Sequence, residues 1–329
     1  MQFLYIVIAL VLIFDFINGF HDSANSIATV VSTKVLSPIA AVGMAAFFNF
    51  IAFVIFPLNV AHTMGSKVVN PDVINLTVIA SALVAAIMWN LLTWWFGLPS
   101  SSSHTLTGGL VGAAVASSGW SSVILSGVIK IVVFIVIAPL LGMIMSFIIS
   151  AIVIFLARKH SPSGIDKHFR RLQLLSAAAF SLGHGGNDAQ KSMGIIWVAL
   201  IATGLATKND PIALWIVLSC QAAIALGTLT GGWRIVKTMG QKITKLKPFE
   251  GFCAETAGAM TLFVATHFGI PVSTTHTITG AIIGAGARKG VSAVKWGVTT
   301  RIFWAWILTI PVSAIVGSSV FLILNRIIT

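Results

Sequence analysis

The sequence predicts an all-α polytopic membrane protein made of two inverted-topology repeats, with two re-entrant helical hairpins and broken helices at the midplane. Three observations predict this fold: long apolar runs, polar motifs that occur twice, and basic residues that alternate between equivalent loops. Of the 329 residues, 57% are hydrophobic and 9% are charged, a composition typical of chains that cross a bilayer several times. A membrane β-barrel would instead show short segments of alternating hydrophobicity.

Long apolar runs mark the predicted membrane helices, since each run reaches the roughly 20 residues that are needed to cross the hydrocarbon core. These runs are residues 1–20, 39–58, 73–96, 122–157, 211–231 and 302–324. The first run has neither a basic segment before it nor a small-residue cleavage site after it. We therefore expect a retained membrane helix there rather than a removed signal peptide.

A motif of proline, serine and threonine occurs twice, as "GLPSSSSHTLTGGLVGAA" at 97–114 and "GIPVSTTHTITGAIIGAG" at 269–286. The identical pairs include Pro99 and Pro271, Ser101 and Ser273, His104 and His276, Thr105 and Thr277, Gly108 and Gly280, and Gly112 and Gly284. Proline followed by serine or threonine is typical of a helix start. We therefore expect half-helices to begin at about Ser101 and Ser273.

A second motif pair lies upstream of each copy, with "NGFHDSANSIA" at 18–28 corresponding to "HGGNDAQKSMG" at 184–194. The pairing aligns Gly19 with Gly185, Asp22 with Asp188 and Ser26 with Ser192. Two motifs repeated in the same order indicate a duplicated chain. The predicted parts are a first membrane repeat at 1–157, a basic cytoplasmic linker at 158–171 and a second, inverted membrane repeat at 172–329.

Equivalent loops of the two repeats differ in charge. Residues 59–72 contain one lysine and residues 116–122 are uncharged, whereas the corresponding segments 232–250 and 288–295 are basic. By the positive-inside rule, equivalent loops then lie on opposite faces of the membrane. The segments predicted to be cytoplasmic are Lys34, 158–171, 232–250 and 288–295, and those predicted to be outside are Lys67, Lys208 and both termini. This bias accounts for the net charge of +12, so we expect no nucleic-acid partner.

The same topology requires each proline-containing motif to be the tip of a hairpin inside the membrane. Irregular backbone at that depth lines a cavity in inverted-repeat transporters, and helix N-termini attract anions. Two such ends could hold one tetrahedral oxyanion. The residues predicted to bind it are Asn25, Ser101, Ser102, Ser103, Thr105, Lys191, Ser273, Thr274 and Thr275. The alternative is that small residues only allow close helix packing, which is the role we expect for the GxxxG pairs Gly108 with Gly112 and Gly280 with Gly284.

Intramembrane carboxylates indicate a second function, because they are costly unless they bind or transfer a charge. We predict that Asp22 and Asp188, with Asn187, bind Na⁺ or relay H⁺. The alternative is a structural carboxylate paired with Lys191 or Lys130.

Glycines just before the two aspartates, at Gly19, Gly185 and Gly186, are expected to break the helices. Asp15 and Glu255 have no counterpart in the other repeat, so each is either a further ion ligand or a salt-bridge partner. His104 and His276 are expected to be hydrogen-bonded packing residues.

Together, "GFHDSANSIATVVSTKVLSP", "HGGNDAQKSMG", "GFCAETAGAM" and "GIPVSTTHTITGAIIG" resemble the inorganic phosphate transporter (PiT) family across both halves. The resemblance implies symport of inorganic phosphate with Na⁺ or H⁺, with Na⁺ favoured, by a homodimer in the plasma (inner) membrane that needs no other cofactor. It places Asp22, Asn25, Asp188 and the tip hydroxyls around substrate and ion, and adds Glu255 from "CAET" as a coupling-ion residue. Two departures are His21, where the family has asparagine, and the short linker.

Sulfate transport, an anion channel and an intramembrane hydrolase are the alternative functions. Sulfate permeases share the family motifs, but a carboxylate that faces the anion would favour phosphate, which keeps a proton that sulfate lacks. An anion channel fits central carboxylates less well than a coupled carrier does. An intramembrane hydrolase is disfavoured because the G-x-S-x-G and H-E-x-x-H patterns are absent from the sequence, so we expect no enzyme.

Overall fold

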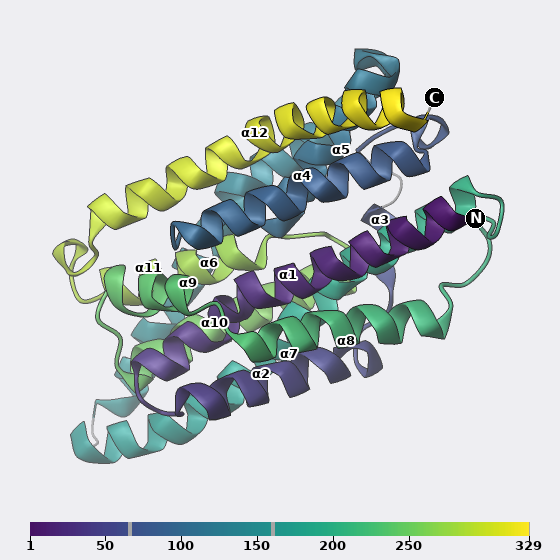
Figure 1. Ribbon diagram of the computed structural model, residues 1–329. Coiled ribbons are helices and arrows are strands. Elements are labelled where there is room, and N and C mark those ends of the chain that lie inside the picture. Colours follow the sequence, from purple (N-terminus) through teal and green to yellow (C-terminus); the bar gives the residue numbers. More distant parts are fainter. Residues whose placement is uncertain (65–67, 159–161, 329) are drawn as a thin grey trace.

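The computed structural model describes residues 1–64, 68–158 and 162–328, and these residues fold into one bundle of helices (Figure 1). The α-helices are α1 (Gln2–Ser32), α2 (Pro38–Ile51), α3 (Asn59–Met64), α4 (Leu76–Trp95), α5 (Ser102–Ser118), α6 (Leu125–Ala157), α7 (Pro162–Ala202), α8 (Leu214–Thr230), α9 (Trp233–Lys237), α10 (Pro248–His267), α11 (Thr274–Ala287) and α12 (Trp296–Ile328). The shorter elements are η1 (Ala52–Val54), η2 (Pro71–Val73), η3 (Trp120–Ser122), the π-helical η4 (Thr238–Lys242) and η5 (Val291–Ala293).

Within the described residues, four helices are long and apolar enough to cross a membrane, namely α1, α4, α6 and α12. A fifth crossing is formed if α8 and the segment Trp233–Lys242, which meet at 60°, are taken as one broken span. The predicted run 39–58 is shorter than expected, because its apolar helix covers Pro38–Val54. The prediction of an all-α membrane protein with several apolar spans is confirmed.

Two hairpins, α4–α5 and α10–α11, enter the bundle from different ends. The first residues of α1 and α4 share a hydrophobic core cluster with the end of α12, through Leu4, Val78 and Phe321. The first turns of α10 share the other cluster with the later part of α1, through Ala254 and Ala28. Figure 1 accordingly shows both chain termini at one end of the bundle.

Helix starts at the two tips lie where the sequence predicts them. Helix α5 begins at Ser102 with Ser101 as its N-cap, whose Oγ accepts the His104 N–H at 3.3 Å. Helix α11 begins at Thr274 with Ser273 as its N-cap, whose Oγ accepts the His276 N–H at 3.2 Å. The predicted half-helix starts are therefore confirmed.

The predicted helix breaks at Gly19, Gly185 and Gly186 are wrong, because α1 and α7 run through these residues without interruption. The glycines instead allow close packing. Gly19 lies against the backbone of Ile224 on α8, and Gly185 lies against the backbone of Asn49 on α2. A side chain at either position would push the neighbouring helix away.

The two GxxxG pairs pack each hairpin against the other predicted half. Gly108 and Gly112 on α5 face the backbone of Ile310 and Ala314 on α12. On the opposite side, Gly280 and Gly284 on α11 face the backbone of Pro139 and Met143 on α6. The predicted packing role of these glycines is confirmed, and the hairpins are exchanged between the halves.

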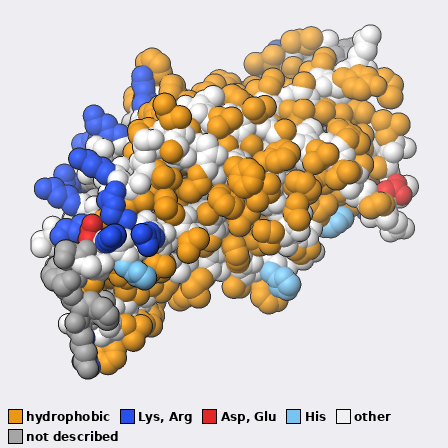
Figure 2. Space-filling model, turned by 90° about the horizontal axis from the view of Figure 1, so that it is seen from below, with side chains coloured by type: hydrophobic (Ala, Val, Ile, Leu, Met, Phe, Trp, Pro, Cys, Tyr) orange, Lys and Arg blue, Asp and Glu red, His pale blue; other side chains and the backbone are white. Residues whose placement is uncertain are grey.

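Basic segments that are far apart in the sequence meet at the end opposite the termini. The Arg170 guanidinium donates to the carbonyl of Lys34, and Lys289 bridges to Glu250 at 2.8 Å. Figure 2 shows Lys and Arg side chains gathered at this end, with mainly hydrophobic side chains along the rest of that face. Most of the predicted linker 158–171 forms the first turns of α7, while its residues 159–161, like Lys67, lie outside the described residues.

Candidate functional site

The two hairpin tips meet the polar middle segments of α1 and α7 inside the bundle. Four side chains with charges or amides converge there, and all are at least 98% buried: Asp22, Asn25, Asp188 and Lys191. Burial of this kind requires partners for each polar group. The partners come mostly from the tips.

Asn25 connects α1 to the tip of the second hairpin. Its Nδ2 donates to Thr275 Oγ1 at 2.9 Å and lies 3.4 Å from Thr274 Oγ1. The Thr275 hydroxyl in turn donates to Asp22 Oδ2 at 3.2 Å. The first repeat's amide and carboxylate therefore hold the second repeat's hydroxyls.

Lys191 connects α7 to the tip of the first hairpin. Its Nζ donates to Ser103 Oγ and to Asp188 Oδ1, both at 2.5 Å, and to the carbonyl of Val272 at 3.0 Å. Asp188 Oδ2 also accepts from Thr274 Oγ1 at 3.1 Å. The pairing of Asp188 with Lys191 that we considered as a structural alternative is present in the site, beside the tip contacts.

These contacts follow the duplication. Asn25 and Lys191 occupy equivalent positions in the two motifs, as do Thr275 and Ser103. The side chains of Asn25 and Lys191 each donate a hydrogen bond to the tip that belongs to the other repeat. The site is thus assembled by exchange between the repeats, and neither repeat completes it alone.

The residue before each aspartate holds the hairpin of its own repeat. His21 lies 2.7 Å from Asp22 Oδ1 and 3.2 Å from Thr93 Oγ1 on α4. Asn187 Nδ2 donates to Thr266 Oγ1 on α10 at 3.1 Å and to the carbonyl of Ile270 at 3.3 Å. Asn187 Oδ1 has no hydrogen-bond partner among the described residues, so it is free to accept a cation.

The helix starts leave N–H groups available for an anion. The first N–H groups of an α-helix have no intrahelical partner, and the caps use only those of His104 and His276. The N–H groups of the residues before them remain at each tip: Ser102, Ser103, Thr274 and Thr275. The hydroxyls of Ser101 and Ser273 are engaged as caps, and the Thr105 hydroxyl donates to the carbonyl of Ser102 at 2.7 Å.

A possible cation position lies beside the tips. Ligand atoms of Asp22, His184 and Asp188 lie within 4.8 Å of one another, and all three residues are buried. His184 was not predicted, although it begins the "HGGND" motif one helical turn before Asp188. Its Nε2 lies 3.3 Å from Asp188 Oδ2, and its Nδ1 lies 3.2 Å from Asn49 Oδ1.

Glu255 lies in a different cluster. Its carboxylate accepts hydrogen bonds from Thr29 Oγ1 and Ser176 Oγ at 2.5 Å and from Gln173 Nε2 at 3.1 Å. These neighbours satisfy the buried carboxylate, and none of the three belongs to a tip. The structure therefore separates Glu255 from the other residues predicted for the coupling ion.

His104 and His276 have the packing role that we expected. Their rings lie 4.8 Å apart, and His276 stacks on Trp306 with ring centroids 3.9 Å apart. The predicted hydrogen bonds are missing in the described part of the chain for His104 Nδ1 and for both ring nitrogens of His276.

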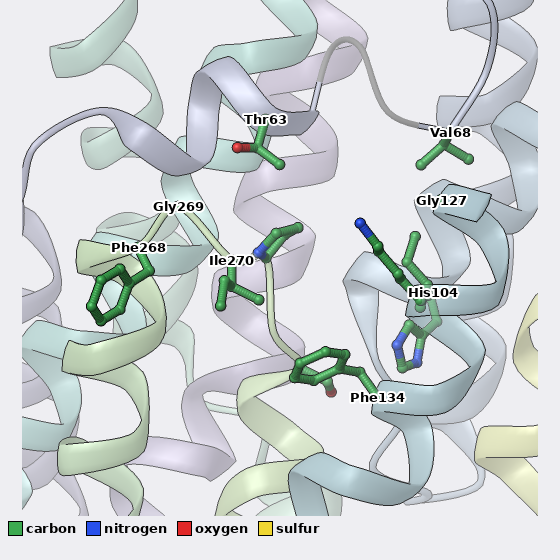
Figure 3. A pocket seen from close by; sticks show the side chains of 12 residues that line it. Thr63, Val68, His104, Gly127, Phe134, Phe268, Gly269 and Ile270 are labelled. Carbon is green, nitrogen blue, oxygen red and sulfur yellow. The ribbon is translucent and has the colours of Figure 1, made fainter. Parts of the chain in front are cut away.

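A pocket of about 270 Å³ reaches the tips from the end that holds the termini. Its lining includes His104 and Ser273 at the tips and Lys130 on α6. Figure 3 shows Thr63 and Val68 at one side of the pocket and His104 and Phe134 at the other, with Ile270 between them. The pocket lined by Lys34, Arg170 and Lys247 at the basic end contains no tip residue.

A profile of the phosphate transporter family matches residues 18–164 and 156–317. The chain belongs to the phosphate transporter family. The two matched segments cover the two halves of the chain. Membership confirms the predicted resemblance, and it confirms a transporter rather than an enzyme.

Relatives are similar over nearly the whole chain. A probable low-affinity inorganic phosphate transporter of Rhizobium meliloti (strain 1021) is 56% identical, covering 94% of this chain and 93% of the relative. The Bacillus subtilis (strain 168) protein of the same description is 44% identical over 98% of this chain and 97% of its own. A solved structure described as the sodium-dependent phosphate transporter superposes with a TM-score of 0.88 at 26% identity, covering 99% of this chain and 100% of that one.

Proposed function

We propose that this chain imports inorganic phosphate by symport with a cation, Na⁺ rather than H⁺, through alternating access of two inverted repeats. The observation that carries the proposal is the convergence of both exchanged tips on Asp22, Asp188 and Lys191. The names of the relatives support phosphate as the substrate.

Anion binding is supported by the donors that face the centre of the site. Free N–H groups at two helix starts favour a tetrahedral oxyanion, and Lys191 adds a charged donor. The hydroxyls of Ser103, Thr274 and Thr275 complete a set that can donate to several oxygens at once. Asn25 keeps the second tip in place for this purpose.

Coupling follows from the charges around the donors. Asp22 and Asp188 are two carboxylates against one lysine, and this imbalance repels a phosphate dianion in a site of low dielectric constant. A cation at the carboxylates removes that repulsion. Because linkage is reciprocal, the cation then raises the affinity for phosphate by the same factor as phosphate raises the affinity for the cation.

Sodium is favoured over the proton because oxygen atoms predominate around the two aspartates. Hard cations prefer carboxylate and amide oxygens, and the free Asn187 Oδ1 extends this set. The structural relative is described as sodium-dependent, which agrees with this choice.

Access from one side at a time is supported by the pockets. The tips border the pocket from the terminal end, and Lys130 is positioned to attract an anion there. Rocking of the repeats would close this pocket and open the site toward the basic end. We place the basic end in the cytoplasm and the termini outside, in the plasma (inner) membrane. We also retain the homodimer and the repeat limits 1–157 and 172–329 as predictions.

Uptake of radiolabelled phosphate into proteoliposomes tests the proposal. Vesicles receive an inward Na⁺ gradient, an inward H⁺ gradient or neither, with excess sulfate as a competitor. We expect accumulation with the Na⁺ gradient alone and no competition by sulfate. Accumulation of sulfate would reassign the substrate, accumulation with the H⁺ gradient alone would reassign the ion, and equilibration without a gradient would indicate a channel.

A further inference from the structure

Asp15 is a buried carboxylate outside the phosphate site. It lies on α1 about two turns before Asp22, toward the terminal end, and it is fully buried. Neither carboxylate oxygen has a hydrogen-bond partner among the described residues. The isolated burial of such a group costs several kcal/mol unless it is neutralised or paired, so this position needs a ligand or a proton.

Polar atoms near Asp15 are unsatisfied as well. Asn18 lies one turn further along the same face of α1, and Asn18 and Ser192 on α7 lie close to the Asp15 carboxyl without forming a hydrogen bond of normal geometry to it. Asn18 Oδ1 and Ser192 Oγ have no hydrogen-bond partner in the part of the chain that the structure describes. Both side chains are at least 99% buried.

A third helix contributes Gln221. It lies on α8, which packs along α1, and it is fully buried. Its Oε1 and Nε2 both have no partner within the described ranges. Unsatisfied side chains thus come from α1, α7 and α8, which pack against one another.

The chemistry of this cluster indicates a cation. Asp15, Asn18, Ser192 and Gln221 offer mainly oxygen atoms, which hard cations prefer. The neighbouring Lys191 already donates to Asp188, Ser103 and the Val272 carbonyl.

Glu255 provides a contrast within the same chain. It is another buried acid without a counterpart in the other repeat, and it accepts hydrogen bonds from Thr29, Gln173 and Ser176. Protein donors therefore satisfy Glu255. They do not satisfy Asp15.

We propose that Asp15, Asn18, Ser192 and Gln221 form an additional binding site for Na⁺, separate from Asp22 and Asp188. The choice of Na⁺ rests on the proposed function, whereas the existence of a cation site rests on the unsatisfied oxygens. The site belongs to one repeat only, because Ser181 stands where the second repeat would need an aspartate.

Equilibrium binding of ²²Na⁺ to the purified full-length protein in detergent, without phosphate, tests the proposal. We expect Asp15→Asn to bind one Na⁺ fewer per chain than the wild type. Asp72→Asn is the matched control, since Asp72 is an exposed aspartate on η2, and it should bind as the wild type does. Unchanged Na⁺ stoichiometry in Asp15→Asn would overturn the proposal and would indicate a protonated carboxyl.

A second variant guards against misfolding of the first. Gln221→Met keeps the side-chain length and removes both polar atoms, so we expect at least a severalfold weaker affinity for one Na⁺ in a protein that elutes normally on gel filtration. Wild-type affinity for every bound Na⁺ in this variant would contradict the proposal. Na⁺-driven phosphate uptake by the wild type is measured in parallel. This measurement distinguishes failure of the additional Na⁺ site from failure of the proposed Na⁺-coupled phosphate transport.

Discussion

Asp22 and Asp188 occupy equivalent positions but differ in their neighbours. Asp22 contacts His21 and the Thr275 hydroxyl, whereas Asp188 also forms an ion pair with Lys191. The proposed cation would therefore meet one carboxylate that lacks a lysine and one that is paired with a lysine. Substitution of Asp22 therefore removes a carboxylate without a lysine partner, whereas substitution of Asp188 also removes the counterion of Lys191.

Asp22→Asn is expected to abolish cation-coupled phosphate uptake while the protein remains folded in the membrane, because the amide keeps the shape and loses the charge. Asp188→Asn should do the same. It should also destabilise the fold by about 3 to 5 kcal/mol, since it leaves Lys191 buried without its counterion. Uptake and the amount of membrane protein are measured together, with the exposed Asp210→Asn as the control. Wild-type uptake by both site variants would contradict the ion-site assignment.

Lys191→Asn gives the second repeat the residue that the first repeat has. We expect the KM for phosphate to rise by roughly tenfold or more, because a charge-assisted hydrogen bond at the first tip is replaced by a neutral one. Initial uptake rates over a range of phosphate concentrations measure the effect. A KM equal to that of the wild type would show that Lys191 only neutralises Asp188.

At the scale of the helices, a glycine can either interrupt a helix or allow a neighbouring helix to pack closely, and the sequence does not distinguish these two roles. The helix starts at Ser102 and Thr274 were predictable because proline and serine act locally. The breaks predicted at Gly19 and Gly185 were wrong because those glycines face neighbouring backbones. Such contacts depend on tertiary packing.

Long-range contacts explain the other differences between prediction and structure. The sequence identified the two tips and the two aspartates but not the exchange of hairpins between repeats, which depends on how α5 meets α12. Glu255 was grouped with the aspartates because the family resemblance implied it through the "CAET" motif, yet its hydrogen bonds go to Thr29 and Ser176. His184 was not predicted, because its position beside Asp22 depends on how α7 packs against α1.

Gly284→Leu tests the contact between α11 and α6. The new side chain would collide with the backbone of Met143, so the second hairpin must shift and we expect uptake to fall by at least tenfold. Gly43→Leu on α2 is the matched control, because a Cβ there meets no atom within 4 Å. Equal uptake by the two variants would mean that the contact does not position the tip.

At the scale of the whole molecule, the distribution of charge sets the predicted orientation. Lys34, Arg170 and Lys289 come from three distant segments and meet at one end, whereas the termini lie at the other end (Figure 1). The two hairpins enter the bundle from different ends, as the proposed inverted repeats require. The orientation of the protein in the cell membrane can therefore be tested by labelling single introduced cysteines at each end of the bundle.

Cysteine labelling in intact cells tests this orientation. The two native cysteines, Cys220 and Cys253, are buried, so an introduced cysteine gives the main signal. A membrane-impermeant maleimide should label Lys208→Cys from outside and should label Lys242→Cys only after the cells are permeabilised. The reverse pattern would contradict the proposed topology.

The central claim is that the cation at the two aspartates and the anion at the two tips share one site and bind cooperatively. The most direct measurement is the Kd for phosphate of the purified protein as a function of Na⁺ concentration, for the wild type and for Asp22→Asn, with choline replacing Na⁺ at constant ionic strength. The account predicts that Na⁺ lowers the Kd of the wild type at least tenfold and has little effect on the variant. An equal Na⁺ dependence in both proteins would contradict it, because the coupling would then reside elsewhere in the molecule.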